Sequence, residues 1–281
     1  MVFLRAVEVF PPLFPISPIG GKPLDPAKKL KRFVEGVKGI AKYSDLVLVA
    51  SVKNPAMVRF SPIEAAVLLE ERLRVKASPT IVVRDENRLQ LLSSVMTAIT
   101  LGLRTLTLVW GDRYPARVRA TNVRDYPSLS SFIEEAKRIG RLAGVKTMIL
   151  APIDLSRLDT ESGVAVARSR LKSGADLLLA QPPTTDSGET LEAHSAVLKS
   201  SGLKDRVLLN VFPFRSRRDV AYCEKYFGWK LPPSLHRLAE SGRPALLREA
   251  RSVAEQIRDQ GHTGAYITTR GHPEVARSIL G

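Results

Sequence analysis

The amino-acid sequence predicts an α/β fold, a (β/α)8 TIM barrel formed as a single domain over residues 1–281. Short apolar segments rich in β-branched residues alternate regularly with longer segments of helical period. No low-complexity linker interrupts this alternation, and 281 residues is a usual length for one such barrel. A doubly wound open sheet is the alternative, because alternation alone does not show that the sheet closes.

Eight segments are predicted as strands because each is apolar, rich in β-forming residues and followed by a segment of helical period. In chain order they are Phe3–Phe10, Leu46–Ser51, Thr80–Arg84, Thr105–Trp110, Thr147–Ala151, Leu177–Gln181, Val207–Phe212 and Gly264–Thr268. Crossover helices of this kind join parallel strands, which a closed barrel arranges without a free edge.

The predicted helices are amphipathic, and several have a capping residue before them or a glycine after them. They are Pro26–Tyr43, Pro62–Val75, Glu86–Leu101, Ser128–Ala143, Glu161–Ser173, Glu189–Ser200, Arg217–Phe227 and Ala245–Gln260, with a short helix at His272–Leu280. The region around 213–262 is longer than the other connections, and we expect it to be an enlarged connection inside the barrel domain.

The composition, with 44% hydrophobic and 25% charged residues, is that of a globular protein and excludes a disordered or collagenous chain. Cys223 is the single cysteine and has no partner for an internal disulfide. Arg5 and Glu8 interrupt the apolar stretch at the start, which argues against a signal peptide, and no apolar run is long enough for a membrane helix. We therefore expect a cytoplasmic protein without a membrane partner.

The net charge of +15 is unusual and predicts a positive field that attracts anions. The basic residues are scattered, with short clusters only at Lys28–Arg32 and Arg215–Arg218. Because no nucleic-acid recognition motif accompanies them, we expect no specific nucleic-acid binding. A basic surface without a ligand and a small ligand bearing phosphates or carboxylates are the two interpretations that remain.

Glu8 is the strongest candidate for a catalytic residue. Alternation along the first strand places it on the face opposite Val7 and Val9, pointing into the barrel near the carboxyl end, where active sites of this fold lie. Burial raises the pKa of such a carboxyl, so that it can hold a proton and act as a general acid. The alternative is a structural ion pair between Glu8 and a basic residue.

Other strand ends carry residues that suit a flat, polar ligand, although each also has a structural interpretation. Gly111 and Asp112 follow the fourth strand, and Gln181 ends the sixth with an amide that can both donate and accept. Phe212 and Phe214 follow the seventh, where they form either a wall for a flat ring or part of the core. Arginines at the start of the next helix oppose its dipole, so nearby acids or a bound anion are expected to offset them.

The sequence lacks several common signatures. The phosphate-binding GxGxxG and GxxxxGK[ST] motifs are absent, which argues against a Rossmann or P-loop nucleotide site. The histidines have no HExxH spacing, so we expect no metal site. The histidines are His194, His236, His262 and His272.

Taken in order, the strand ends resemble the methylenetetrahydrofolate reductase family of flavin-bearing barrels. Three fragments carry the likeness: the run Val7–Pro12, the segment from Gly102 to Asp112, and the stretch from Arg170 to Gln181. Phe212 with Pro213 and the run Leu231–Leu235 also fall in family order. Thr80 stands where the family has a histidine, and Trp110 where it has an arginine.

The resemblance implies that Glu8 is the proton donor that helps to open a methylene bridge. It also implies a flavin, FAD by the family pattern with FMN or a deazaflavin as alternatives, and a pterin substrate. The implied flavin-binding residues are Thr80, Trp110, Gly111, Asp112 and Arg170. The implied substrate-binding residues are Gln181, Phe212, Phe214 and Arg270, with Arg170, Arg215 and Arg217 as further candidates for anionic groups.

We therefore expect a reductase that converts a methylene-tetrahydropterin to its methyl form. The alternative is a barrel without catalytic activity that presents a one-carbon pterin to a methyltransferase. An unrelated barrel lyase acting on an anionic sugar or acid is a third option. A methyltransferase or an electron-donor protein is the expected protein partner, and the chain is a candidate homo-oligomer.

Overall fold

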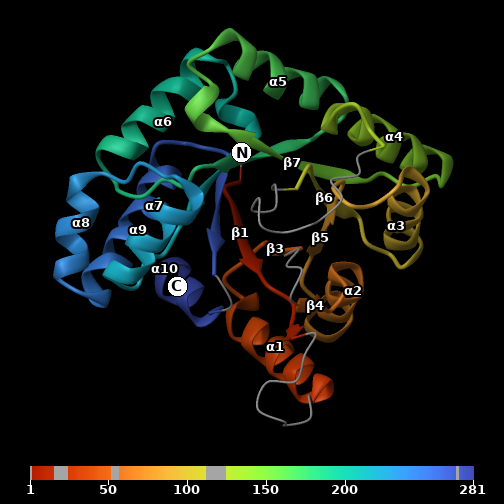
Figure 1. Ribbon diagram of the computed structural model, residues 1–281, viewed down its shortest axis with the longest axis horizontal. Coiled ribbons are helices and arrows are strands. Elements are labelled where there is room, and N and C mark those ends of the chain that lie inside the picture. Colours follow the sequence, from red (N-terminus) through yellow and green to blue (C-terminus); the bar gives the residue numbers. More distant parts are fainter. Residues whose placement is uncertain (1, 16–24, 52–56, 112–124, 270–271) are drawn as a thin grey trace.

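The computed structural model describes residues 2–15, 25–51, 57–111, 125–269 and 272–281. Eight parallel strands close into a barrel in the order β1-β10-β9-β8-β7-β6-β5-β3, with the helices around it (Figure 1). The strands are β1 (Leu4–Val9), β3 (Leu46–Val49), β5 (Ala77–Val82), β6 (Thr105–Val109), β7 (Met148–Asp154), β8 (Leu177–Gln181), β9 (Val207–Val211) and β10 (Gly264–Thr268). The predicted (β/α)8 barrel is therefore confirmed, and the open sheet is excluded.

The described helices follow the barrel strands in the predicted order. They are α1 (Pro26–Ala41), α2 (Pro62–Leu73), α3 (Arg88–Thr100), α4 (Leu129–Leu142), α5 (Glu161–Lys172), α6 (Glu189–Ser200), α7 (Arg217–Phe227), α8 (Pro233–Glu240), α9 (Arg243–Asp259) and α10 (Glu274–Leu280). Six of them begin at a side chain that accepts a hydrogen bond from the backbone N–H three residues ahead. Each such cap stabilises the helix by about 1 kcal/mol.

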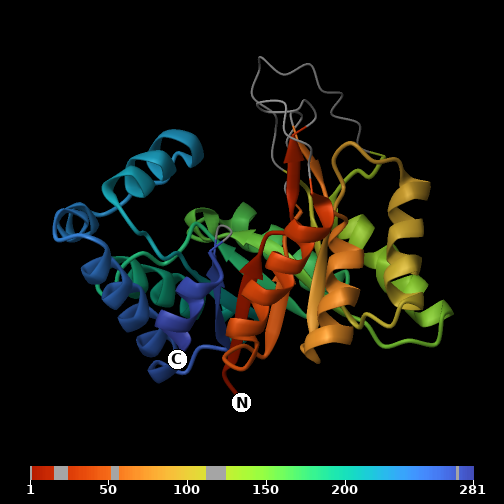
Figure 2. The ribbon, with the colours of Figure 1, turned by 90° about the horizontal axis from the view of Figure 1, so that it is seen from below.

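The connection between β9 and β10 holds three helices, α7, α8 and α9, where the sequence predicted an enlarged connection with two. In Figure 2 these helices, drawn in blue, lie on the side of the barrel next to β10. α8 begins at Pro233, a position where proline is tolerated because the first helical N–H needs no partner. Its eight residues are too few for a clear helical period, which is why the sequence did not predict it.

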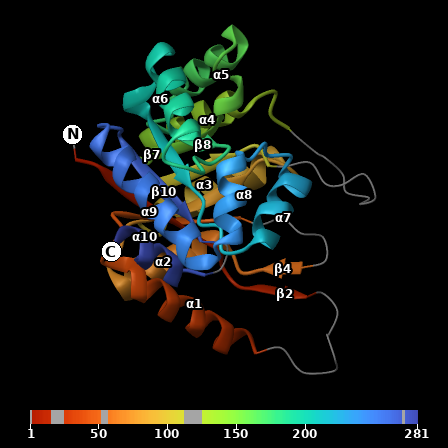
Figure 3. The same cartoon turned by 90° about the vertical axis from the view of Figure 1, so that its left-hand side faces the viewer.

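Two short strands outside the barrel were also not predicted. β2 (Leu13–Pro15) pairs in the antiparallel direction with β4 (Met57–Arg59), and Figure 3 shows them side by side. Both follow the carboxyl end of a barrel strand, β1 or β3. Their three residues each give no recognisable alternation, so only the structure reveals this addition to the barrel.

The apolar core has two layers that the alternation of strand residues separates. Ala6, Leu48 and Tyr266 belong to the cluster that fills the barrel interior, together with leucines of β3, β7, β8 and β9. Val7 and Val9 face the other way, into the larger cluster between the strands and the helices. Within the described residues, no helix is both long and apolar enough to cross a membrane.

Candidate active site

A layer of polar side chains lies above the apolar interior, toward the carboxyl ends of the strands. Glu8 follows Ala6 on the interior face of β1, and Thr268 follows Tyr266 on the same face of β10. Glu8 and Thr268 are direct partners in the register of the two strands. Asn210 of β9 and Gln181 of β8 lie at the corresponding interior positions, each two residues after a buried leucine of its own strand. The barrel mouth is therefore polar where its floor is hydrophobic.

Glu8 has the environment that a proton donor needs. The residue is half-buried, and loss of solvation raises the pKa of its carboxyl group, while a hydrogen bond with Thr268 acts in the opposite direction. No ion pair to Glu8 is formed by any described residue, so the alternative of a structural ion pair gains no support from this part of the chain. The arrangement favours a carboxyl group that keeps its proton at higher pH than an exposed glutamate.

Tyr266 joins this layer to Gln181. Its hydroxyl donates to the carbonyl of Ala180 (2.7 Å) and accepts from Nε2 of Gln181 (2.8 Å). Burial, and next the nearby charge of Glu8, raises the pKa of the tyrosine hydroxyl well above 10, so it stays neutral. The amide nitrogen of Gln181 is thereby fixed, and its Oε1 accepts no hydrogen bond from a described residue. That oxygen can accept an N–H from a ligand.

Asn210 and Thr268 complete the network and were not predicted from the sequence. Thr268 donates its hydroxyl to Oδ1 of Asn210 (3.2 Å), while Nδ2 of Asn210 is buried and has no hydrogen-bond partner among the described residues. The signal was present, because Asn210, Tyr266 and Thr268 are polar residues at interior positions of apolar strands. The alternation that placed Glu8 in the barrel would have placed them too.

Gly111 is required by the backbone at the end of β6. Its φ is +88°, and a Cβ there would lie 2.6 Å from Cγ1 of Val82 and 3.0 Å from Cβ of Arg84. Trp110 packs against the layer between the strands and helices, and its carbonyl accepts from the N–H of Arg84 (3.2 Å). The absent side chain of Gly111 thus makes room for neighbouring protein atoms, which leaves its predicted contact with a flavin without support.

The remaining residues predicted to bind a flavin are placed as follows. Arg170 of α5 donates to the backbone carbonyl of Pro152, and burial lowers the pKa of its guanidinium. This bond uses one of the five guanidinium donors, so a role of Arg170 in holding flavin phosphates stays a prediction. Thr80 is half-buried on the interior face of β5 and lines a pocket of about 660 Å³ bounded by β4, α2 and α3. Asp112 lies outside the described residues.

Phe212 and Phe214, predicted as substrate-binding residues, are both buried in an apolar cluster under α7 and α8. Their ring centroids are 4.8 Å apart, and Phe212 also meets the ring of Trp229 at 5.3 Å. The structure thus places them as core-forming residues, and contact with a substrate stays a prediction. Arg270, the other predicted substrate-binding residue, lies outside the described residues.

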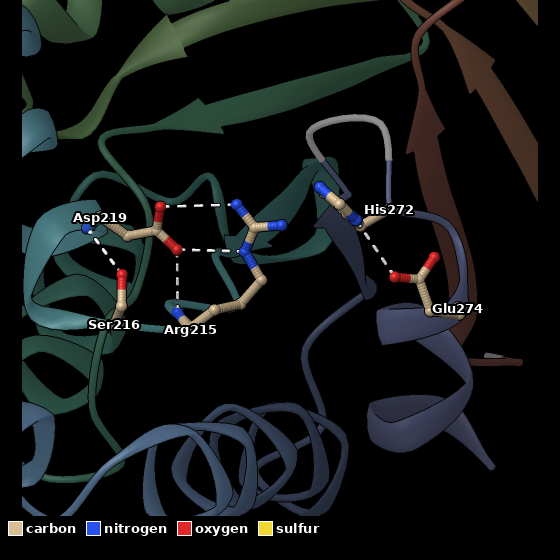
Figure 4. Close-up of polar contacts among 5 residues, drawn as sticks. All are labelled: Arg215, Ser216, Asp219, His272 and Glu274. Atoms are coloured by element: carbon tan, nitrogen blue, oxygen red, sulfur yellow. Dashed lines mark hydrogen bonds and ion pairs between the residues drawn. The ribbon is translucent and has the colours of Figure 1, made fainter.

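The arginines at the start of α7 are offset by nearby acids. Arg215 donates through its backbone N–H (3.0 Å) and its Nε (3.1 Å) to Asp219, while Ser216 caps the helix (Figure 4). Arg217 lies 4.0 Å from Glu240. Of the two expectations for these charges, nearby acids and a bound anion, the structure shows the first. On the facing segment in Figure 4, His272 bonds to Glu274 at 3.1 Å.

Comparisons with known proteins relate the chain to barrels only at the level of fold. A scan against family models and a search of curated proteins returned no match. Among solved structures, an uncharacterized protein from Clostridium thermocellum that binds two copies of 5-methyl-5,6,7,8-tetrahydrofolic acid aligns with a TM-score of 0.61 and 12% identity, covering 99% of this chain and 95% of its own.

Two further solved structures have the same relation. An oxaloacetate acetylhydrolase aligns with a TM-score of 0.55 and 10% identity over 95% of this chain and 75% of its own. An aldolase aligns with a TM-score of 0.51 and 16% identity, covering 92% of both chains. None of the three is named as a methylenetetrahydrofolate reductase, and identities this low establish the barrel fold alone.

Proposed function

We propose that the chain binds a tetrahydropterin carrying a one-carbon group at the carboxyl end of the barrel, where Glu8 serves as its proton donor. The observation that carries this proposal is the desolvated carboxyl of Glu8 on the interior face, beside Tyr266 and without a basic partner among the described residues. The Clostridium thermocellum barrel supports the choice of ligand, because a barrel of the same fold binds a reduced folate.

The polar layer accounts for two steps. Gln181, oriented by Tyr266, presents Oε1 to the N–H groups of the pterin ring. The protonated carboxyl of Glu8 then gives its proton to a bridge nitrogen of a methylene-tetrahydropterin. The bond between that nitrogen and the methylene carbon breaks, its electron pair stays on the nitrogen, and the carbon becomes an iminium. Addition of a hydride to that carbon would complete the reduction to the methyl form.

The source of the hydride is a separate question. A flavin, the cofactor that the resemblance implies, would supply this hydride, and Gly111 and Arg170 are among the residues predicted to hold it. Binding and protonation are the two steps that we assign to this chain's own residues. Titration with FAD and FMN, followed by the change in flavin fluorescence on binding, tests whether the predicted cofactor is taken up.

The experiment uses sodium cyanoborohydride as an external hydride donor, so that protonation is tested without a cofactor. Wild-type protein should accelerate the conversion of methylene-tetrahydrofolate to methyl-tetrahydrofolate, because the iminium is the form that this reagent reduces. Glu8→Gln should bind the pterin with similar affinity and lose the acceleration, by roughly a hundredfold or more. Equal acceleration by both proteins would remove Glu8 from the chemistry, and failure of both to bind any tetrahydropterin would reject the proposal.

The alternative, a barrel that binds the pterin without acting on it, predicts a different result in the same assay. Both proteins would then bind the pterin, and neither would change the rate of reduction. The raised pKa of the Glu8 carboxyl suits the catalytic version, because a carboxyl that keeps its proton near neutral pH can deliver it as a general acid.

A further inference from the structure

A second pocket lies on the outer side of the barrel wall, where the carboxyl ends of β1 and β10 face α1. Its volume is about 280 Å³, slightly below the range for a whole drug-sized ligand, so it suits one portion of a larger molecule. The described residues that line it are Val9, Phe10, Pro12, Leu13, Lys29, Arg32, Phe33, Val37, Thr269 and Pro273.

The charged side chains among the described lining residues of this pocket are all positive. Lys29 and Arg32, both from the basic cluster Lys28–Arg32 of the sequence, line it, and no acid is among its lining residues. Lys29 donates to the carbonyl of Leu13 (3.0 Å) and keeps its other N–H groups. Arg32 is exposed and forms no hydrogen bond or ion pair with a described residue. The pocket therefore offers two cations to an anionic group.

Apart from Thr269, the rest of the described lining is apolar and includes two aromatic rings. Phe10 and Phe33 are half-buried and come from different elements, the first following β1 and the second on α1. Pro12 and Leu13 add aliphatic surface. Aromatic side chains favour contact with another ring. A ligand group that combines an aromatic ring with a carboxylate matches both the rings and the cations.

The pocket contacts the backbone of the candidate active site at the end of β1. Thr269, one of its lining residues, donates its hydroxyl (2.7 Å) and its backbone N–H (3.2 Å) to the carbonyl of Glu8. Phe10 is two residues beyond Glu8, a span of about 7 Å along an extended chain. A molecule that places one end beside Glu8 can therefore reach this pocket across the ends of β1 and β10.

We propose that this pocket binds an aromatic carboxylate. Resting on the proposed function, we further infer that it holds the aminobenzoyl and glutamate portion of a folate-type pterin while the pterin ring lies beside Glu8. The basic cluster on α1 thereby selects pterins with an anionic tail over pterins without one.

The experiment compares three probes: tetrahydrofolate, which has the tail, 6-methyltetrahydropterin, which lacks it, and N-(4-aminobenzoyl)glutamate, which is the tail alone. Binding is measured by calorimetry with wild-type protein, with Arg32→Gln and with Lys38→Gln. Lys38 is exposed on the same helix but does not line the pocket, so its replacement removes one positive charge as a control. Arg32→Gln should weaken tetrahydrofolate and the tail roughly tenfold and leave 6-methyltetrahydropterin unchanged.

Several outcomes would overturn the inference. Equal weakening of all three probes, or an equal effect of Lys38→Gln, would show a general field of the surface. No effect of Arg32→Gln on the tail and tetrahydrofolate, or no binding of the tail alone, would also reject it. If 6-methyltetrahydropterin fails to bind while the tail binds in a manner that depends on Arg32, the pterin proposal fails and the aromatic-carboxylate pocket stands.

Discussion

The hydroxyl of Tyr266 provides a quantitative test of the barrel interior. Tyr266→Phe removes a group that is fully buried and that forms two hydrogen bonds, one to Ala180 (2.7 Å) and one from Gln181 (2.8 Å). A typical buried hydrogen bond contributes about 1 kcal/mol, so the substitution should destabilise the protein by about 2 kcal/mol. For a chain of 281 residues, whose unfolding entropy is on the order of 0.6 kcal/mol/K, Tm should fall by about 3 °C.

Calorimetry or chemical denaturation of Tyr266→Phe measures this change, and Tyr226→Phe is the matched control. Tyr226 is 60% exposed and its hydroxyl has no hydrogen bond within the described residues, so its loss should change stability by less than about 0.5 kcal/mol. If the two variants are equally stable, the hydroxyl of Tyr266 does not hold Gln181, and the orientation proposed for that amide is wrong.

Three further predictions concern stability. Gly111→Ala should destabilise the protein by about 2 kcal/mol, because the φ of Gly111 is +88° and the new Cβ would lie 2.6 Å from a side-chain carbon of β5. The control is Gly39→Ala, whose new Cβ would have no atom within 4 Å. In the same thermal melt this control should be neutral or stabilising. The hydrogen bond from Arg88 lowers the pKa of Glu135 to about 2. The pair therefore stabilises the fold fully above pH 4.5, and this contribution is lost as the pH falls from 4.5 toward 2. In acid titrations of stability, Glu135→Gln should lack that decline. Burial raises the pKa of the Glu8 carboxyl in the folded protein, so the unfolded chain loses this proton first and the fold becomes less stable as the pH rises above 4.5. Glu8→Gln cannot ionise and should be more stable than wild type at pH 7 in urea denaturation.

The predictability of the fold varied with the length of the element. Alternation of strands and helices was enough for the barrel, because each long element repeats its own period. The predicted bounds of two strands were wrong where the strand contains a proline. β5 begins at Ala77, before Pro79, whereas the sequence predicted a start at Thr80. Likewise β7 continues through Pro152 to Asp154 instead of ending at Ala151. Proline lacks an N–H for the ladder, so a sequence argument ends a strand where tertiary packing continues it.

The candidate site was predictable where a polar residue interrupts an apolar strand. Glu8 was placed in the barrel because its neighbours Val7 and Val9 must face the helices. The hydrogen bond that connects Tyr266 with Gln181 joins residues 85 positions apart, and no local pattern indicates such a contact. The engagement of Arg170 with a backbone carbonyl of β7 was equally hidden, since it depends on how α5 packs on the barrel.

The protonation state of Glu8 is the most direct test of the account. Infrared difference spectra between wild-type protein and Glu8→Gln, recorded across a pH titration with and without 5-methyltetrahydrofolate, isolate the carboxyl stretch of this one residue. A protonated carboxyl band that persists well above pH 4.5 and shifts in frequency when the pterin is added is the predicted result. A Glu8 carboxyl group that ionises at or below pH 4.5, or a carboxyl band that the pterin leaves unchanged, would contradict the account.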